Sequence, residues 1–149
     1  MPSPAAKFIN LCPVFLSKDV RKTVQFYVEK LGFKSAQHYD KITSFATLYR
    51  DEIEFVIVQA SKGEVQNNTQ RYGAGYDAYI DTAEVTGVDE LHAEYAAKGV
   101  KIIAPPFNTD YGSREFVFED IDGRHIGVGL IANNALYFKN SDFSAEEAA

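Results

Sequence analysis

The chain has little of what marks a secreted, disulfide-stabilised or membrane-spanning protein. Its one cysteine, Cys12, excludes a disulfide framework within the chain. No apolar run approaches the roughly 18 residues that cross a bilayer, and residues 1–4 show no basic region followed by an apolar one. We therefore expect a cytoplasmic protein with no membrane partner.

Positive charge is also scarce. The chain has 15 Lys and Arg residues against 21 Asp and Glu residues, which gives a formal net charge of −6 at pH 7. Because nucleic-acid binding requires a basic stripe and none is visible, we expect no nucleic-acid partner. An acidic surface is compatible with a positively charged ligand, although it is also common in proteins that bind none.

Tryptophan is absent, yet aromatic residues are abundant, with 11 Phe and 9 Tyr. Most aromatic side chains of a protein this size fill the space between sheet and helices. The number exceeds what such a core needs, so some of these rings are candidates for the lining of a groove.

The strongest pattern is an internal repeat. An apolar run at 8–16 leads into a helical pattern that stops at Gly32, and a run at 77–81 leads into one that stops at Gly99. In each half, extended segments then follow around an acidic turn. A repeat of this length indicates two copies of one supersecondary unit, neither of which buries its apolar face alone.

The repeat predicts an α+β fold made of two βαβββ modules. We place the modules at residues 7–60 and 74–131 of a single domain that spans 1–149, with a linker at 61–73 and a C-terminal extension at 132–149. The strands are expected to form a curved mixed sheet with the helices on its outer face.

Local patterns refine this prediction. Residues 8–16 are typical of one largely buried strand. Ser17 or Asp19 is expected to cap the first helix, and residues 86–89 resemble a capping box at the start of the second. The proline-rich segment 105–112 is expected to be a loop.

Two segments carry a recognisable signature. The first runs from Asp19-Val20 through Phe26-Tyr27 to Leu31-Gly32-Phe33. The second runs from Gly112-Ser113-Arg114-Glu115-Phe116 to Asp120-Ile121-Asp122-Gly123. On these residues the chain resembles the vicinal oxygen chelate superfamily, which contains glyoxalase I, extradiol dioxygenases and bleomycin-resistance proteins. The resemblance covers about residues 8–131. One departure is Ile121, which stands where the superfamily usually has proline.

Catalytic members of this superfamily usually hold a divalent metal, so the resemblance implies ligands from the first and last strands of each module. These four positions fall on Cys12, on Glu54, on Gly75 or its neighbour Tyr76, and on Gly127. Divalent metals draw three or four N, O or S donors, and glycine has no side chain to offer. We therefore predict no metal site, no cofactor and no catalytic residues.

Within the superfamily the resemblance is closest to the bleomycin-resistance proteins. It implies a metal-free homodimer that sequesters a cationic, aromatic small molecule in grooves between its two chains. The implied groove and its lip are formed by Cys12, Phe45, Glu54, Asp77, Tyr79, Phe107, Tyr111, Arg114 and His125. Glu54 and Asp77 would attract the ligand's charge or act as an acid/base pair, or one of them would pair with Arg114.

Two other hypotheses remain open at the level of sequence. The first is a glyoxalase-like lyase, isomerase or dioxygenase with an unusual metal centre at Glu54, His125 and Cys12. The second is a structural or regulatory dimer in which the linker and the C-terminal extension carry the interaction.

Overall fold

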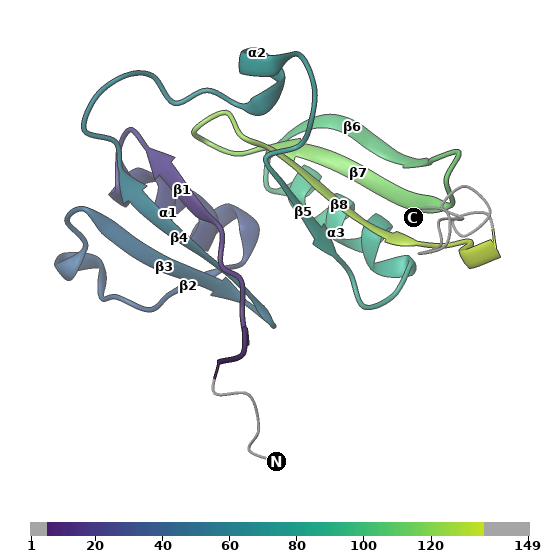
Figure 1. Ribbon diagram of the computed structural model, residues 1–149, viewed down its shortest axis with the longest axis horizontal. Coiled ribbons are helices and arrows are strands. Elements are labelled where there is room, and N and C mark those ends of the chain that lie inside the picture. Colours follow the sequence, from purple (N-terminus) through teal and green to yellow (C-terminus); the bar gives the residue numbers. More distant parts are fainter. Residues whose placement is uncertain (1–5, 136–149) are drawn as a thin grey trace.

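A computed structural model of the chain describes residues 6–135, and the two halves of the sequence form two modules side by side (Figure 1). The first module consists of β1 (Val14–Ser17), α1 (Val20–Leu31), β2 (Lys34–Ser35), a 3₁₀ turn (Tyr39–Lys41), β3 (Phe45–Arg50) and β4 (Ile53–Gln59). Helix α2 (Asn68–Tyr72) follows in the connection. The second module consists of β5 (Ala78–Asp81), α3 (Thr86–Ala97), β6 (Lys101–Asn108), β7 (Ser113–Glu119) and β8 (His125–Ile131).

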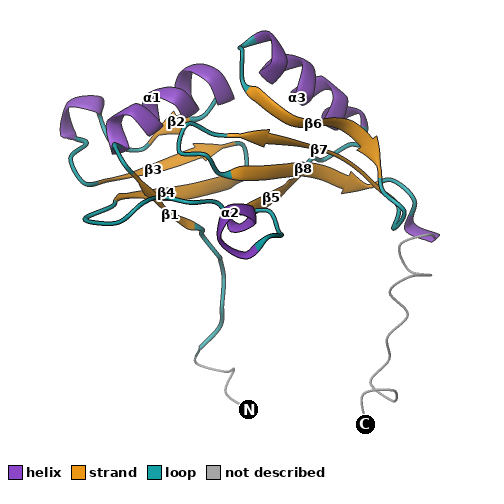
Figure 2. Cartoon of the chain, turned by 90° about the horizontal axis from the view of Figure 1, so that it is seen from above, coloured by secondary structure: helices purple, strands orange, loops and turns teal. Residues whose placement is uncertain are grey.

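The predicted α+β class and the two βαβββ modules are confirmed. The strands form two four-stranded mixed sheets, with the orders β1-β4-β3-β2 and β5-β8-β7-β6. Helices α1 and α3 lie on one side of both sheets, and α2 lies on the other (Figure 2). We call the side without α1 and α3 the open face. None of the helices in residues 6–135 is both long and apolar enough to cross a membrane.

The ends of α1 follow from its sequence. Of the two candidate caps, Asp19 takes the position, because its carboxylate accepts the backbone N–H of Lys22 at 3.3 Å. Ser17 instead bonds the hydroxyl of Thr23 at 2.7 Å. Gly32 ends the helix with a φ of 75°, a left-handed conformation that glycine adopts without strain.

Three local predictions were wrong. The first strand begins at Val14 rather than at residue 8, and the side chains of Phe8, Ile9 and Leu11 are exposed. Helix α3 has no capping box, because Val85 holds the N-cap position and makes no side-chain cap hydrogen bond.

The segment 105–112, expected to be a loop, lies partly in β6, which continues to Asn108. Pro105 and Pro106 are tolerated there because β6 is the last strand of its sheet, so no further strand needs their missing N–H groups. The register between β6 and β7 shifts twice, between Ile102 and Ala104 and again between Ala104 and Phe107.

A single buried core joins the two modules on the helix side. Tyr27 of α1 and Tyr95 of α3 belong to one cluster of buried residues that also contains Phe55 and Phe118. The hydroxyl of Tyr27 donates to Asp120 of the second module at 2.7 Å, and that of Tyr95 donates to the carbonyl of Leu31 at 3.0 Å. The relation is reciprocal, since each helix tyrosine binds the other module.

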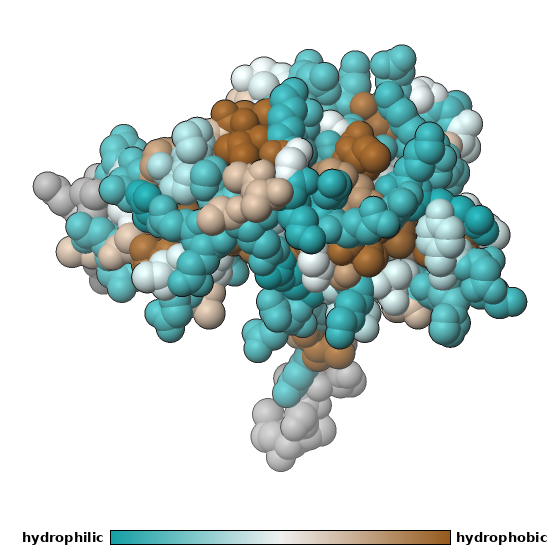
Figure 3. All heavy atoms as spheres, turned by 180° about the vertical axis from the view of Figure 1, so that it is seen from behind, coloured by the Kyte–Doolittle hydropathy of each residue, from teal (hydrophilic) through white to brown (hydrophobic). Residues whose placement is uncertain are grey.

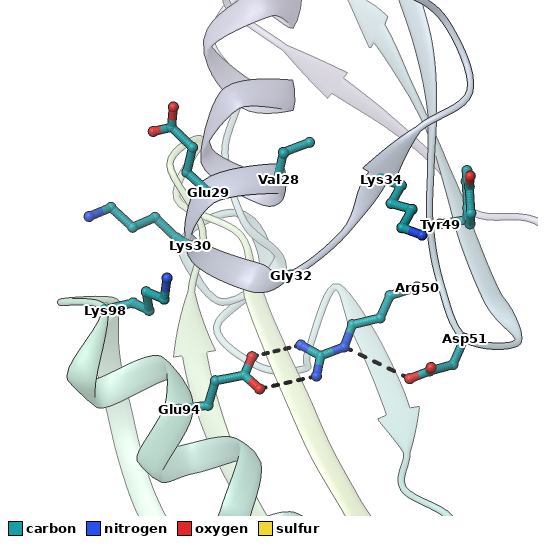
Figure 4. A pocket seen from close by; sticks show the side chains of 10 residues that line it. All are labelled: Val28, Glu29, Lys30, Gly32, Lys34, Tyr49, Arg50, Asp51, Glu94 and Lys98. Carbon is teal, nitrogen blue, oxygen red and sulfur yellow. Dashed lines mark hydrogen bonds and ion pairs between the residues drawn. The ribbon is translucent and has the colours of Figure 1, made fainter.

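An ion pair also links the two modules at the surface. Arg50, at the end of β3, reaches across to α3 and binds Glu94 through two nitrogens, at 2.7 and 3.1 Å (Figure 4). Its guanidinium also donates to the carbonyl of Leu31 at 2.8 Å. From the helix side the surface is mostly hydrophilic, with separate hydrophobic patches (Figure 3).

Candidate functional site

An acidic cleft of about 850 Å³ lies where the start of β4 faces β5. Glu54, Asp77 and Tyr79, all predicted as groove residues, line it together. The carboxylates in its wall are Asp51, Glu52, Glu54, Asp77 and Asp81, and no Lys, Arg or His is among the lining residues. The cleft therefore attracts positively charged groups.

Glu54 is the part of this cleft next to the N-terminal segment. The amide nitrogen of Asn10 donates to Glu54 Oε1 at 2.8 Å, and the thiol of Cys12 lies 3.8 Å from the backbone oxygen of Glu54. Burial, followed by the negative charge of Glu54, raises the pKa of the Cys12 thiol. Cys12 is therefore a neutral thiol at pH 7 and lacks the activated thiolate of a catalytic cysteine.

Asp77 is held by backbone donors. Its two carboxylate oxygens accept the N–H groups of Asn68, at 2.9 Å, and of His125, at 2.8 Å. It thus ties the start of α2 to the start of β8 at the edge of the cleft. The pairing of Glu54 or Asp77 with Arg114 was not found, because Arg114 binds Asp89 of α3 at 2.7 and 2.8 Å, on the helix side.

The side chains of His125 and Phe107 lie on the open face of the second module, and neither residue lines the cleft. The ring of His125 is 3.1 Å from Glu119, its partner in β7. Phe107 is the β6 partner of Glu115 in the strand register, which places both on the same side of the sheet. The structure therefore gathers Glu54, Asp77 and Tyr79 in the cleft, with Cys12 beside Glu54, and leaves Arg114 apart from them.

Phe45 belongs to an apolar part of the open face, on the first module. In the strand register Phe45 pairs with Val58, which pairs with Leu16 on the other side. Val14 lies one pleat away on the same side, and the side chains of Val14, Leu16 and Phe45 are 62%, 53% and 51% exposed. These side chains form an exposed apolar row across three strands of the first module.

The most heavily bonded group on the open face, Glu115, was missed by the sequence analysis. This carboxylate is 1% exposed and accepts hydrogen bonds from the hydroxyls of Tyr76, Tyr79 and Ser113, at 2.9–3.0 Å, and of Tyr111, at 3.2 Å. The side of the sheet on which Glu115 lies could have been predicted from the sequence. Glu115 directly precedes the core residue Phe116 in one strand, so alternation places its side chain on the opposite side, together with that of Ser113. What the alternation did not reveal was the three tyrosines that meet there.

Tyr76 and Tyr79 stay protonated at neutral pH, because the pKa of each hydroxyl is raised above its ordinary value. Burial is the main cause, and hydrogen bonding to Glu115 adds to it, raising the pKa of Tyr76 to about 12 and that of Tyr79 further. Since folding raises these values, the hydroxyls favour the folded state below pH 10 and cease to do so as the pH rises through the raised values.

The residues at the four implied metal positions do not fit a divalent ion. Cys12 and Glu54 lie in the first module, whereas Tyr76 and Gly127 lie in the second, in contact with each other: a Cβ built on Gly127 would be 2.8 Å from the Tyr76 ring. Within residues 6–135, no group of three or more His, Cys, Asp or Glu side chains is placed to hold a metal.

Comparison with known proteins agrees with this architecture. Residues 13–128 match the Glyoxalase/Bleomycin resistance protein/Dioxygenase superfamily. The chain belongs to this superfamily. Among curated proteins, none matches the sequence.

Solved structures share the fold of this chain at low sequence identity. The bleomycin-binding protein from Streptomyces verticillus, complexed with copper(II)-bleomycin, is 24% identical with a TM-score of 0.62, over 83% of this chain and 96% of that one. A superfamily member from Alicyclobacillus acidocaldarius is 17% identical with a TM-score of 0.67, over 91% and 98%. TioX from Micromonospora sp. ML1 is 17% identical with a TM-score of 0.60, over 81% and 94%.

Proposed function

We propose that this superfamily member is a metal-independent binding protein for a cationic, aromatic small molecule. The observation that carries the proposal is the acidic cleft at Glu54 and Asp77, which has several carboxylates and no basic side chain in its wall. Tyr79 supplies an aromatic surface in the same cleft. A similar fold in a bleomycin-binding protein supports a small-molecule ligand.

The binding groove is proposed to be completed by a second copy of the chain. The open face leaves Val14, Leu16 and Phe45 exposed, and covering such a row stabilises a complex by about 25 cal/mol for each Å² of apolar surface. A cleft walled by one chain on one side and by its copy on the other would enclose a ligand more fully than the open cleft does.

The ligand proposal predicts that Glu54→Gln weakens the binding of cationic aromatic compounds roughly five- to tenfold, because one of the charges attracting the ligand is removed. Isothermal calorimetry with bleomycin and with the cationic dye ethidium measures this change. Glu64→Gln, an equal change of charge in the linker and outside the cleft lining, is the matched control and should bind as the unmodified protein does. Absence of heat for both compounds at high micromolar concentration would contradict the proposal.

The dimer proposal predicts that Phe45→Asp converts a dimer into a monomer, since it places a charge within the apolar row. Sedimentation equilibrium measures the mass of each form. The control is Val28→Asp, on the exposed side of α1, which should leave the dimer unchanged. If the unmodified chain sediments as a monomer at 100 μM (a concentration of order 10⁻⁴ M, well above the Kd of a stable dimer), a groove between copies is excluded.

A further inference from the structure

Glu115 is a buried carboxylate whose bonded partners are all neutral hydroxyls. Five hydrogen-bond contacts of 2.9–3.4 Å reach it from Tyr76, Tyr79, Tyr111 and Ser113. No Lys, Arg or His of residues 6–135 forms an ion pair with it. The negative charge is therefore spread over hydroxyl groups and is not cancelled by a protein cation.

The other charges of this face do not neutralise Glu115 either. Lys101 and His125 both bind Glu119 at the far end of β7, at 3.2 and 3.1 Å. In the strand register Asp81 pairs with Gly129, which pairs with Glu115. The charged residue in the same cross-strand row as Glu115 is therefore also acidic. The surface above Glu115 is therefore electronegative.

Gly127 and Gly129 of β8 leave the space that the side chains of Tyr76 and Tyr79 occupy. A Cβ at Gly127 would come within 2.9 Å of both the Tyr76 and the Tyr79 rings. A Cβ at Gly129 would collide with the Tyr79 hydroxyl and lie 2.7 Å from Glu115 Cβ. The two rings are nearly parallel, with an interplanar angle of 19° and centroids 6.2 Å apart.

The three tyrosine residues remain partly exposed although Glu115 is not. Tyr76, Tyr79 and Tyr111 are 39%, 42% and 41% exposed, whereas Glu115 is 1% exposed. A phenol that donates its proton to an anion gains electron density in its ring, which strengthens the attraction of the ring for a cation. A ligand thus meets the charge of Glu115 through the tyrosine rings.

We propose that Tyr76, Tyr79 and Tyr111, backed by Glu115, form a binding site for a quaternary ammonium group. The inference rests on the proposed function, and it specifies the cationic group of the proposed ligand. Tyr79 lines the acidic cleft and also bonds Glu115, so one ligand can reach both places. A quaternary ammonium has no N–H donors and is attracted by ring faces alone. A primary ammonium needs acceptors in place of its water, and the acceptors of Glu115 are already occupied.

The test uses tetramethylammonium, methylammonium and the neutral tert-butanol as probes, followed by NMR of the tyrosine ring resonances. Tetramethylammonium is expected to bind with a Kd in the millimolar range and at least fivefold more tightly than either other probe. Its shifts should fall on Tyr76, Tyr79 and Tyr111. Equal affinities for tetramethylammonium and tert-butanol, or shifts confined to other tyrosines, would overturn the proposal.

Two variants separate the charge from the rings. Glu115→Gln keeps the shape of the side chain and is expected to weaken tetramethylammonium binding three- to tenfold without changing that of tert-butanol. Its control, Glu29→Gln, makes the same charge change on the exposed surface of α1. Tyr111→Leu removes one ring from a loop position and should weaken binding at least threefold, whereas Tyr72→Leu on α2 should not. If either site variant binds tetramethylammonium as tightly as its control does, the proposal fails. If the Glu115→Gln chain does not fold, the result for Tyr111→Leu decides.

The outcome is separable from that of the proposed function. If tetramethylammonium does not bind while ethidium does, in a manner sensitive to Glu54→Gln but not to Glu115→Gln, the quaternary ammonium site is refuted and the cleft proposal stands. If ethidium and bleomycin also fail to bind, the cleft proposal falls with it.

Discussion

Replacing Arg124 with alanine is expected to lower the free energy of unfolding by about 3–5 kcal/mol, because the change leaves buried carboxylates without their counter-ion. The side chains of Arg124, Asp120 and Asp122 are 5%, 0% and 6% exposed. Arg124 binds Asp120 at 2.8 Å and Asp122 at 3.0 Å. Denaturation by urea, followed by circular dichroism, measures the loss.

Arg124 matters because it also reaches the other module. Its guanidinium donates to the carbonyl of Leu16 in β1 and lies 4.6 Å from the centre of the Phe15 ring. Asp122 in turn accepts the backbone N–H of Lys18 at 3.2 Å. The acidic turn of the second module is therefore bonded directly to the first, and Arg124→Ala should weaken the joint between them.

The matched control is the exposed ion pair of Arg114 and Asp89. Removing it with Arg114→Ala should destabilise the fold far less than Arg124→Ala does, since water screens both partners. Hydrogen bonding to Arg114 lowers the pKa of Asp89, so this small contribution is present above the carboxyl's ordinary pKa and is lost as the pH falls through the lowered one. A loss for Arg124→Ala no greater than that for Arg114→Ala would contradict the proposed role of Arg124.

The second large effect is expected for Gly129→Ala, which should destabilise the fold by about 1–3 kcal/mol through overpacking. A Cβ at this position would lie 2.7 Å from the backbone oxygen of Arg114 in β7 and would collide with the hydroxyl of Tyr79. The backbone oxygen cannot move without distorting the β7–β8 ladder, so the strands and Tyr79 must both shift. Thermal unfolding by calorimetry measures the cost.

Gly87→Ala is the matched control for this prediction. Gly87 lies in α3, where alanine is favoured over glycine by up to about 1 kcal/mol. A Cβ there would have Thr82 Cβ as its closest neighbour, at 3.3 Å, a contact that a small shift relieves. Gly87→Ala should therefore be neutral or stabilising. If Gly129→Ala is equally well tolerated, the close contact between Tyr79 and Gly129 of β8 is contradicted.

The architecture could be predicted because each module repeats strong local signals. The helical spacing after Asp19 and the left-handed stop at Gly32 belong to a few neighbouring residues, and the structure shows both. The beginning of β1 could not be predicted in this way. Residues 8–13 are as apolar as a strand, but in the structure only the part from Val14 onward pairs with β4 in the ladder.

The candidate site was predicted in part. The family resemblance implied that Glu54 and Tyr79 share one groove, and the structure brings both to one cleft. Alternation does not say which strand lies beside which, so the pairing of Arg114 with Asp89 and the convergence of three tyrosines on Glu115 were not foreseen.

The sequence by itself determined the two βαβββ modules and the absence of a side chain at Gly127, because helix stops, strand periods and residue types are properties of single positions or short segments. Only the tertiary structure decided that Gly127 and Gly129 make room for Tyr76 and Tyr79. It also decided that their hydroxyls meet at Glu115. These contacts join β5, β7 and β8 across tens of residues, and no local rule specifies such distances.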